Sequence, residues 1–426
     1  MKILFIACYS PLINNSASIE TLQYLNNLAK IDGNEVHLLT VNFPKNSIYY
    51  DEYILSMLDK RVKKHIISGG KIFERIMPKK SKNAEVVNVS NGNKSFVKAL
   101  LRKGKSIVAI PDMYFNWAKA ASKYGIELVK REKFDVMFSM HEPPSSHICA
   151  LKIKEEFKDL PWVTYWSDPW LKDSTRANIS KARRKFEGSF EKRIVELSDR
   201  FIFVTKANRD DYVSSYNIPV EKTYIVTRGY DENQYEEIKK SLTPKLINKE
   251  KVNFVYAGEI FSKLRDVRPF IEALNNIKDT NISLYNDLNV MFFGNIDDEE
   301  IKNKLMAVDN INVSPRIPYD EALAYMLNSE VLLLFGNKNS KQIPAKIYDY
   351  FGADGIIFVI LGDENDPIKD VVENKNKCVV VNNTADEIVS GINKIISRIK
   401  NGEKYGPIEE YKWQYISKKL NDILKG

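Results

Sequence analysis

A glycine turn followed by cations is the stretch of this sequence best suited to chemistry. An apolar strand ends at Gly258, and a helix is expected to begin near Pro269. Lys263, Arg265 and Arg268 fall at this junction between strand and helix. Bare backbone at the glycine, with cations and a positive helix end nearby, suits a phosphate group. The alternative is a surface loop with incidental basic residues.

A second stretch, residues 341–355, follows an apolar strand that ends near Phe335. Pro344 suits the first position of a helix, so free backbone N–H groups are expected at the helix start. Lys346 and Asp349 are three residues apart and share a helix face. This face could hold a diphosphate and accept hydrogen bonds from sugar or ribose hydroxyls. Alternatively, the two side chains form an ion pair on a solvated helix.

The elements that must position these residues follow an alternating α/β pattern. Short apolar runs, typical of parallel strands buried on both faces, occur at 3–8, 36–41, 136–139, 162–166 and 201–205. Helix-like stretches lie between them at 19–30, 117–131, 145–156 and 181–197. The strand pattern restarts at 252–256, 288–293, 311–313, 331–334, 356–360 and 379–381. The alternation predicts the α/β class, with a doubly wound parallel sheet in each half.

Two Rossmann-like domains are therefore expected in the 426 residues. The predicted boundaries are 1–230 for the first domain, 231–251 for a linker, 252–403 for the second domain, and 404–426 for a final helix that could pack back on the first. Ligands of such sheets bind outside the carboxyl ends of the strands. We expect the two domains to face each other across a cleft that contains the site.

Composition excludes several classes of protein. Hydrophobic residues make up 44% and charged residues 28% of the chain, which is ordinary for a folded protein and too apolar for a disordered one. The apolar run at 3–8 is too short for a signal peptide, and no run of about 18 apolar residues suggests a spanning helix. The three cysteines lie far apart in apolar surroundings, which favours buried thiols in a cytoplasmic protein.

Positive charge is concentrated in residues 60–105. This segment holds fourteen lysines and arginines against two glutamates, a surplus of twelve, whereas the whole chain has a net charge of +8. Such a field favours an anionic partner. Nucleic acid is disfavoured because no recognisable reading motif accompanies the charge. Two interpretations of this charge stay open. One is a peripheral contact with an anionic membrane, and the other is a solvated face without a partner.

The order of several short blocks resembles the nucleotide-sugar glycosyltransferases of GT-B architecture, in particular the retaining family 4. The blocks are Met1-Lys-Ile-Leu-Phe-Ile-Ala-Cys-Tyr-Ser-Pro11, Phe134-Asp-Val, Trp162-Val-Thr-Tyr-Trp-Ser-Asp-Pro-Trp170, Thr227-Arg-Gly-Tyr-Asp231, the Tyr-Ala-Gly turn, and Pro344-Ala-Lys-Ile-Tyr-Asp-Tyr350. The resemblance covers nearly the whole chain. It implies transfer of a sugar from a nucleotide diphosphate to a glycan, with retention of configuration.

The resemblance implies roles for particular residues on the donor side. Arg265 matches the second member of a basic pair that binds the donor diphosphate, and Lys263 substitutes for the first. Asp349 matches the second carboxylate of a Glu-x7-Glu motif, which contacts the donor ribose. Lys341 stands where the first carboxylate is usual, and a lysine cannot accept hydrogen bonds from sugar hydroxyls. Further donor contacts are expected at Gly258, Ile347 and Ser16, with Lys346 beside the leaving group.

The resemblance also implies a catalytic role for Asp168, beside Arg265, Lys346 and Asp349. Asp168 is retained in the block after the fifth strand, where many relatives have a preceding His and this chain has Ser167. His141, His147 and Trp170 are the candidates for contact with the acceptor. A structural role is the alternative for either histidine, and for Trp170 as ordinary core material.

No metal site is expected, because the four histidines show no metal-ligand spacing with cysteine. GT-B enzymes generally place cationic side chains on the diphosphate, so no cofactor is expected beyond a nucleotide-sugar, with UDP as its nucleotide. The expected acceptor is a glycan or a polyprenyl-diphosphate-linked glycan in bacterial surface polysaccharide assembly. Two alternatives stay open, a GT-B nucleotide-sugar 2-epimerase and a degenerate transferase-like binding subunit.

Overall fold

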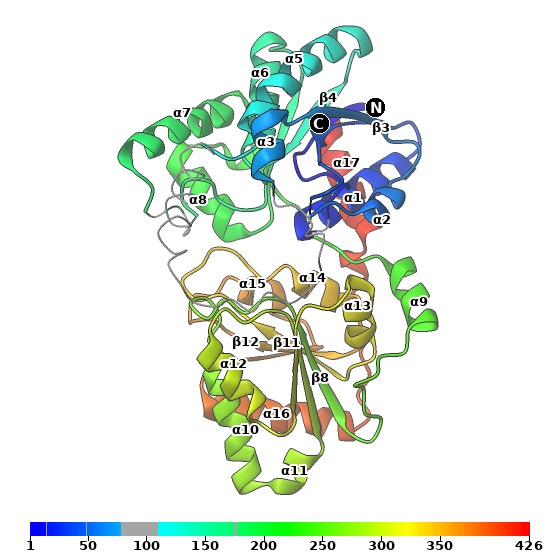
Figure 1. The fold of residues 1–426 in the computed structure, drawn as a ribbon, viewed down its shortest axis with the longest axis vertical. Helices are drawn as coiled ribbons and strands as arrows, with labels where there is room; N and C mark the ends of the chain where they lie inside the picture. Colours follow the sequence, from blue (N-terminus) through cyan, green and yellow to red (C-terminus); the bar gives the residue numbers. More distant parts are fainter. Residues whose placement is uncertain (14, 48, 78–109, 174–175, 177) are drawn as a thin grey trace. The chain divides into compact units, whose positions relative to one another are not determined.

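The computed structural model describes residues 1–426 except 14, 48, 78–109, 174, 175 and 177 (Figure 1). It divides into two compact units, which are described separately. Unit 1 comprises Met1–Val226 and Ser417–Gly426, and unit 2 comprises Thr227–Ile416. The segment 231–251, expected as a linker, falls in unit 2 and contains helix α9 (Glu232–Ser241).

Unit 1 is built on a seven-stranded parallel sheet with the order β3-β2-β1-β4-β5-β6-β7. Its strands are β1 (Lys2–Ile6), β2 (Glu35–Asn42), β3 (Lys63–Ser68), β4 (Val136–Met140), β5 (Trp162–Trp166), β6 (Arg200–Phe203) and β7 (Thr223–Ile225). Every residue of β4 and β5 is buried, as expected for strands covered on both faces.

Helices surround the sheet of unit 1 in the predicted alternation. They are α1 (Ser16–Lys30), α2 (Glu52–Ser56), α3 (Gly70–Ile76), α5 (Phe115–Glu132), α6 (Ser145–Glu156), α7 (Lys181–Leu197), α8 (Lys206–Tyr216) and the end of α17 (Trp413–Lys425). Side-chain caps begin several of them, as where Asn15 accepts from the Ser18 N–H at 2.7 Å. Helix α6 packs against both α5 and α7.

Two strands of unit 1 were not predicted from the sequence. Strand β3 lies at the sheet edge and alternates exposed with half-buried residues, so it lacks the continuous apolar run of the central strands. Strand β7 lies at the other edge and has three residues. Edge strands bury one side less completely, which weakens their hydrophobic signal.

Unit 2 contains a six-stranded parallel sheet with the order β10-β9-β8-β11-β12-β13. Its strands are β8 (Val252–Ala257), β9 (Leu288–Phe293), β10 (Ile311–Ser314), β11 (Val331–Phe335), β12 (Ile356–Ile360) and β13 (Cys378–Val381). The helices besides α9 are α10 (Arg268–Thr280), α11 (Ile282–Asn286), α12 (Glu299–Met306), α13 (Tyr319–Leu327), α14 (Lys346–Phe351), α15 (Lys369–Val372), α16 (Ala385–Lys400) and the start of α17. Helices α10 and α16 pack together beside the sheet (Figure 1).

The three cysteines are free thiols, with Cys8 and Cys149 buried and Cys378 half-buried. Across the described part of the chain, no helix combines the length and the apolar character needed to cross a bilayer.

Candidate functional site

The glycine turn lies at the carboxyl end of β8, in the middle of the sheet of unit 2. Gly258 donates its N–H to the Phe293 carbonyl at 2.7 Å, which extends the pairing of β8 with β9. A Cβ atom on Gly294 would meet the Gly258 carbonyl oxygen at 2.2 Å. A Cβ atom on Gly258 would instead meet the Lys346 Nζ atom at 2.1 Å. The two glycines therefore allow neighbouring backbone and a lysine to approach this turn closely.

Arg265 lies in the loop between β8 and α10, with its guanidinium held in place by three acceptors. Its Nε donates to Asn337 Oδ1 at 3.0 Å, and its Nη1 donates to the Glu259 carbonyl at 2.7 Å and to the Tyr256 hydroxyl at 3.4 Å. Nη2 makes no hydrogen bond to a described residue. Because the fixed N–H groups orient the fork, the remaining ones are available for an anion.

Lys346 begins α14 and brings a second cation to the same tyrosine. Its Nζ lies 3.7 Å from the centre of the Tyr256 ring, a cation–π contact. This atom is buried, and it forms no hydrogen bond to the residues that the structure describes. Burial lowers the pKa of Lys346 well below its ordinary value, and the positive charge of Arg265 lowers it further. A buried ammonium without a hydrogen-bond acceptor is costly, so an anion beside Lys346 would favour its charged form.

Asp349 lies one turn after Lys346 in the same short helix. The Tyr235 hydroxyl donates to its Oδ1 at 3.4 Å, and burial raises the pKa of Asp349 to about 6 despite the nearby positive charge of Arg228. The alternative of a solvated ion pair with Lys346 does not describe this helix, because the Lys346 Nζ atom is buried. Helix α14 begins at Lys346, two residues after the proline expected at its first position.

The other residues predicted on the donor side are spread over both units. Ile347 is a buried residue of α14, whereas the side chains of Lys263 and Lys341 are exposed. Ser16 is an exposed residue at the start of α1 in unit 1. Arg268 turns its guanidinium onto Asp266, with an ion pair of 2.6 Å. The structure thus brings Gly258, Arg265, Lys346 and Asp349 together in unit 2. The donor roles of these four residues, and those of Ser16, Lys263, Lys341 and Ile347, stay predictions.

In unit 1, Asp168 follows the carboxyl end of β5 and is half-buried. It makes no hydrogen bond to a residue that the structure describes. Its predicted role stays a prediction.

Both predicted acceptor histidines are buried in unit 1. His141 follows β4 and stacks on Trp166, with ring centres 5.2 Å apart. Burial lowers the pKa of His141 to about 3, with a smaller effect from the charge of Arg176. His147 is fully buried in α6, where its Nδ1 pairs with the Ser139 hydroxyl at 2.7 Å. Both rings are therefore neutral near pH 7, and their acceptor contacts stay predictions.

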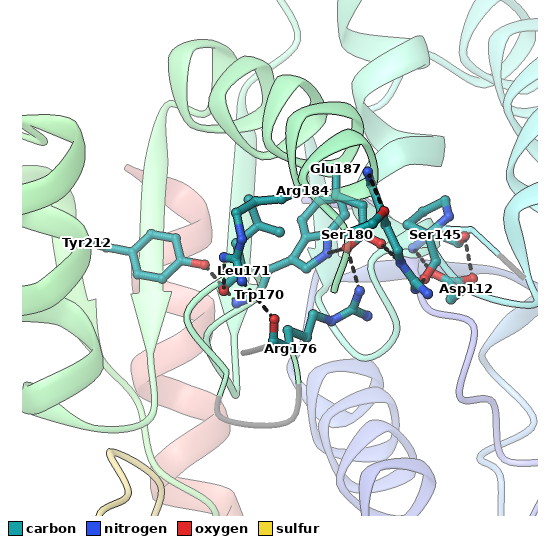
Figure 2. Close-up of polar contacts among 11 residues, drawn as sticks. Asp112, Ser145, Trp170, Leu171, Arg176, Ser180, Arg184, Glu187 and Tyr212 are labelled. Carbon is teal, nitrogen blue, oxygen red and sulfur yellow. Dashed lines mark hydrogen bonds and ion pairs between the residues drawn. The ribbon is translucent and has the colours of Figure 1, made fainter. Parts of the chain in front are cut away.

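Trp170 is fully buried, so its ring offers no face for a sugar in this structure. Its indole N–H donates to Glu187 Oε2 at 2.8 Å, as Figure 2 shows. Arg183 also donates to this carboxylate at 2.6 Å, and Arg176 forms an ion pair with it. Glu187, which is 0% exposed, thus anchors the loop after β5 to helix α7. The hydrogen bond of Trp170 to Glu187 thus stabilises the fold, and the predicted contact of Trp170 with the acceptor stays a prediction.

Asp112 holds the start of α6 in the same region of unit 1 (Figure 2). Its carboxylate accepts from the Ser145 N–H at 2.9 Å, from the Ser145 hydroxyl at 2.7 Å and from the Tyr114 N–H at 2.7 Å. A carboxylate is favourable at a helix N-terminus because the helix dipole is positive there. The N-terminus of α6 is therefore occupied by the Asp112 carboxylate of the protein itself.

Within the described residues, one group of possible metal ligands was missed from the sequence. Ligand atoms of Glu35, His37 and Glu132 lie within 4.8 Å of one another. Lys2 approaches Glu132 at 2.7 Å and Glu35 at 3.3 Å, and Lys63 also pairs with Glu35. These ammonium groups already balance the carboxylates, so the cluster is described as an ion-pair network.

Comparison with known proteins identifies the family of this chain. A family model described as Glycosyltransferase Family 4 matches residues 21–234, half of the chain. The chain belongs to glycosyltransferase family 4. The sequence-based recognition of this family is thereby confirmed.

Solved structures of similar fold match this family 4 chain over its length. A glycosyltransferase from Rickettsia africae matches with a TM-score of 0.62 and 13% identity, covering 100% of this chain and 97% of that one. Sucrose-phosphate synthase from Thermosynechococcus elongatus matches with a TM-score of 0.59 and 12% identity, covering 99% and 98%. UDP-GlcNAc 2-epimerase from Neisseria meningitidis, bound to UDP-GlcNAc, matches with a TM-score of 0.57 and 11% identity, covering 100% and 99%.

At these identities the likeness establishes the fold, and the predicted α/β class with two Rossmann-like domains of GT-B type is confirmed. A search of curated proteins found no match.

Three residues with a role in these contacts were missed from the sequence, two beside the candidate cations of unit 2 and one in unit 1. Tyr256 contacts both candidate cations, Asn337 orients Arg265, and Glu187 anchors the loop that follows β5. A signal existed for two of them. Asn337 is a polar residue two positions after a strand, and Glu187 follows Arg183 at the i,i+4 spacing of helical ion pairs.

Proposed function

We propose that this protein transfers a sugar from a nucleotide-diphosphate donor to a glycan acceptor with retention of configuration. The observation that carries the proposal is the meeting of Arg265 and Lys346 at Tyr256, where both cations keep N–H groups without a described partner. They lie at the carboxyl edge of a parallel sheet, the usual ligand side of such folds. The proposed class of donor, a nucleotide-diphosphate sugar, rests on this cationic site.

The proposed chemistry needs stabilisation of the leaving diphosphate as negative charge develops on it. Arg265 and Lys346 supply the compensating positive charge in a partly buried site. Electrostatic stabilisation is stronger there than in water. The leaving phosphate itself would help to deprotonate the incoming hydroxyl on the same sugar face. Unit 2 contains none of the four histidines of the chain, which fits a reaction without a histidine base in the donor site.

UDP is the nucleotide proposed for the donor, and a hexose or N-acetylhexosamine the sugar. The likeness of fold to an epimerase bound to UDP-GlcNAc supports a nucleotide-sugar as the ligand class. The proposal assigns neutralisation of the diphosphate to side chains, without a metal. A thermal-shift screen of nucleotide-sugars would identify the donor.

Turnover of the nucleotide-sugar by purified protein, with chelator and a glycan acceptor present, tests the function. Formation of a glycoside with the donor's anomeric configuration supports it. Formation of a free 2-epimer without acceptor would support the epimerase instead, and donor binding without any turnover would support a binding subunit. Loss of turnover on chelation would contradict the proposed metal independence.

Asp349→Asn should weaken donor binding by about 1 to 3 kcal/mol, the range for a lost hydrogen bond to a charged group. The thermal midpoint should barely change, because asparagine keeps the volume and an oxygen for Tyr235. Calorimetry of donor binding measures the effect. Asp354→Asn is a matched control, since this exposed carboxylate pairs with Lys239 at 3.1 Å outside the proposed site. Equal donor affinity in wild type and Asp349→Asn would overturn the ribose contact.

We also propose that the basic segment 60–105 brings the protein to an anionic membrane or to a polyprenyl-diphosphate-linked acceptor. This would place the reaction at the inner face of the plasma membrane, in assembly of lipopolysaccharide, O-antigen or capsule. Residues 78–105 of this segment lie outside the described part of the structure, so the support is its charge alone. Each lysine near such a surface contributes about 1 kcal/mol at low salt. Sedimentation should show preference for anionic over neutral liposomes, and equal binding to both would contradict the idea.

A further inference from the structure

Asn337 is a buried amide that links two loops of unit 2. It lies two residues after β11 and is 5% exposed. Its Oδ1 accepts from Arg265 Nε at 3.0 Å, and its Nδ2 donates to the Gln342 carbonyl at 3.1 Å. Because one end of the amide accepts and the other donates, both partners fix its orientation. The amide therefore ties the loop of Arg265 to the loop that leads into Lys346.

Close backbone packing leaves Asn337 little freedom to move. A Cβ atom on Gly362 would lie 2.4 Å from the Asn337 carbonyl carbon. A Cβ atom on Gly336 would lie 1.8 Å from Asp366 Oδ2, which accepts from the Gly362 N–H at 2.8 Å. The next residue, Lys338, donates its N–H to the Leu264 carbonyl at 2.8 Å. The rigid backbone around Asn337 is thus joined directly to the residue before Arg265.

The chemical nature of the amide matters as much as its place. A carboxylate at this position would also accept from Arg265, but it would neutralise the guanidinium in a partly buried site. A neutral amide orients the arginine and leaves its full charge for another anion. The arrangement is suited to an arginine whose final partner is a ligand.

We propose that Asn337 is a positioning residue, which orients Arg265 and the loop of Lys346 for the donor diphosphate without neutralising either cation. The inference rests on the proposed function, because it assumes that a diphosphate binds at Arg265 and Lys346. Asn337 acts through Arg265, since its amide oxygen accepts from that side chain while its amide nitrogen donates to the Gln342 carbonyl. Its removal should therefore change recognition of phosphate and leave recognition of the nucleoside intact.

Calorimetry of the full chain with inorganic pyrophosphate, nucleoside diphosphate and nucleoside tests the proposal. Asn337→Asp should weaken pyrophosphate and nucleoside diphosphate binding by about 10-fold, because an ion pair with Arg265 competes with the ligand. Asn337→Ala should weaken them by a similar factor through lost orientation and should lower kcat more than it raises KM. Nucleoside affinity should stay at the wild-type value in both variants.

Asn289→Ala is a matched control, because Asn289 is a buried amide of β9 bonded to the Leu246 carbonyl and to Asn253. It should lower the thermal midpoint without changing pyrophosphate affinity. If the wild type binds pyrophosphate and both Asn337 variants bind it equally well, the positioning role is wrong. A parallel loss of nucleoside affinity would also overturn it, since that indicates general damage. If Asn337→Ala does not fold, Asn337→Asp and Asn337→Ser decide. Failure of the wild type to bind either phosphate ligand would instead overturn the proposed function.

Discussion

Replacing Arg265 by alanine should lower kcat by about 10²-fold or more, because the leaving diphosphate loses a charged partner as its negative charge develops. The guanidinium is held by Asn337, by the Glu259 carbonyl and by the Tyr256 hydroxyl, so it costs little reorganisation when the ligand binds. Steady-state kinetics with the nucleotide-sugar and an acceptor measure the effect.

The control for Arg265→Ala is the affinity for the free nucleoside, which carries no phosphate. A phosphate contact predicts unchanged nucleoside affinity, whereas a folding defect would weaken all ligands together. A crystal structure with bound nucleoside diphosphate provides the second check. If neither Arg265 nor Lys346 lay within ~4 Å of a phosphate oxygen, the assignment would fail, because charge-assisted hydrogen bonds are short.

Lys346 should take up a proton when a nucleoside diphosphate binds. In the free protein, burial and the charge of Arg265 lower the pKa of this lysine, while the carboxylates of Asp349 and Glu259 oppose them. Tyr256, the remaining titratable group against its ammonium, has a pKa raised by burial and stays neutral. A bound diphosphate favours the charged form and so raises the pKa of Lys346.

The sign of this linkage fixes the dependence on pH. Where the pKa of the ligand-bound lysine exceeds that of the free one, binding takes up as much as about one proton and affinity falls as pH rises between the two values. Protonation of Asp349, whose pKa is raised to about 6, should weaken the donor's ribose contact on the acid side. Affinity for the whole donor should therefore fall on the acid side as Asp349 takes up a proton, and on the alkaline side as the ligand-bound Lys346 becomes harder to protonate.

Calorimetry in buffers of different ionisation enthalpy measures the proton uptake. A pH of about 8 to 9 avoids titration of the phosphate itself, whose second pKa is about 6. Lys346→Met should abolish the uptake and weaken binding by about 10- to 100-fold, the range for a lost charged hydrogen bond. Lys278→Met is the control, because this lysine of α10 pairs with Asp309 at 2.7 Å near the surface. Wild-type binding without uptake, or the same uptake in Lys346→Met, would show that Lys346 is already charged in the free protein.

Much of the fold could be predicted from the sequence because its central strands are buried on both faces. The runs at 162–166, 288–293 and 356–360 have the same bounds in the structure as β5, β9 and β12. A continuous apolar run signals its own burial and needs no knowledge of its neighbours. The edge strand β3 carries no such run, and neither does helix α9, which buries only Tyr235 and Ile238. Helix α9 begins where the Asp231 side chain accepts from the N–H groups of Asn233 and Gln234. This cap is a local helix signal, but the polar composition of residues 231–251 led to the prediction of a linker.

The types and chain positions of the donor residues were also visible in the sequence. Arg265 and Lys346 each follow a strand of the predicted sheet, and a glycine turn precedes one of them. Parallel strands place their carboxyl ends at one edge, so residues after two neighbouring strands are expected to meet. The pairing of β8 with β11 meets this condition.

The sequence by itself thus determined the α/β class and the family, and it supplied the residues that are predicted to bind a diphosphate. Only the tertiary structure decided which atoms meet. It placed the Lys346 ammonium on the Tyr256 ring, oriented Arg265 through an amide 72 residues away, and buried Trp170 against Glu187. The physical reason is that strand and helix signals are local, whereas hydrogen-bond partners and pKa shifts depend on side chains brought together by strand pairing and close packing.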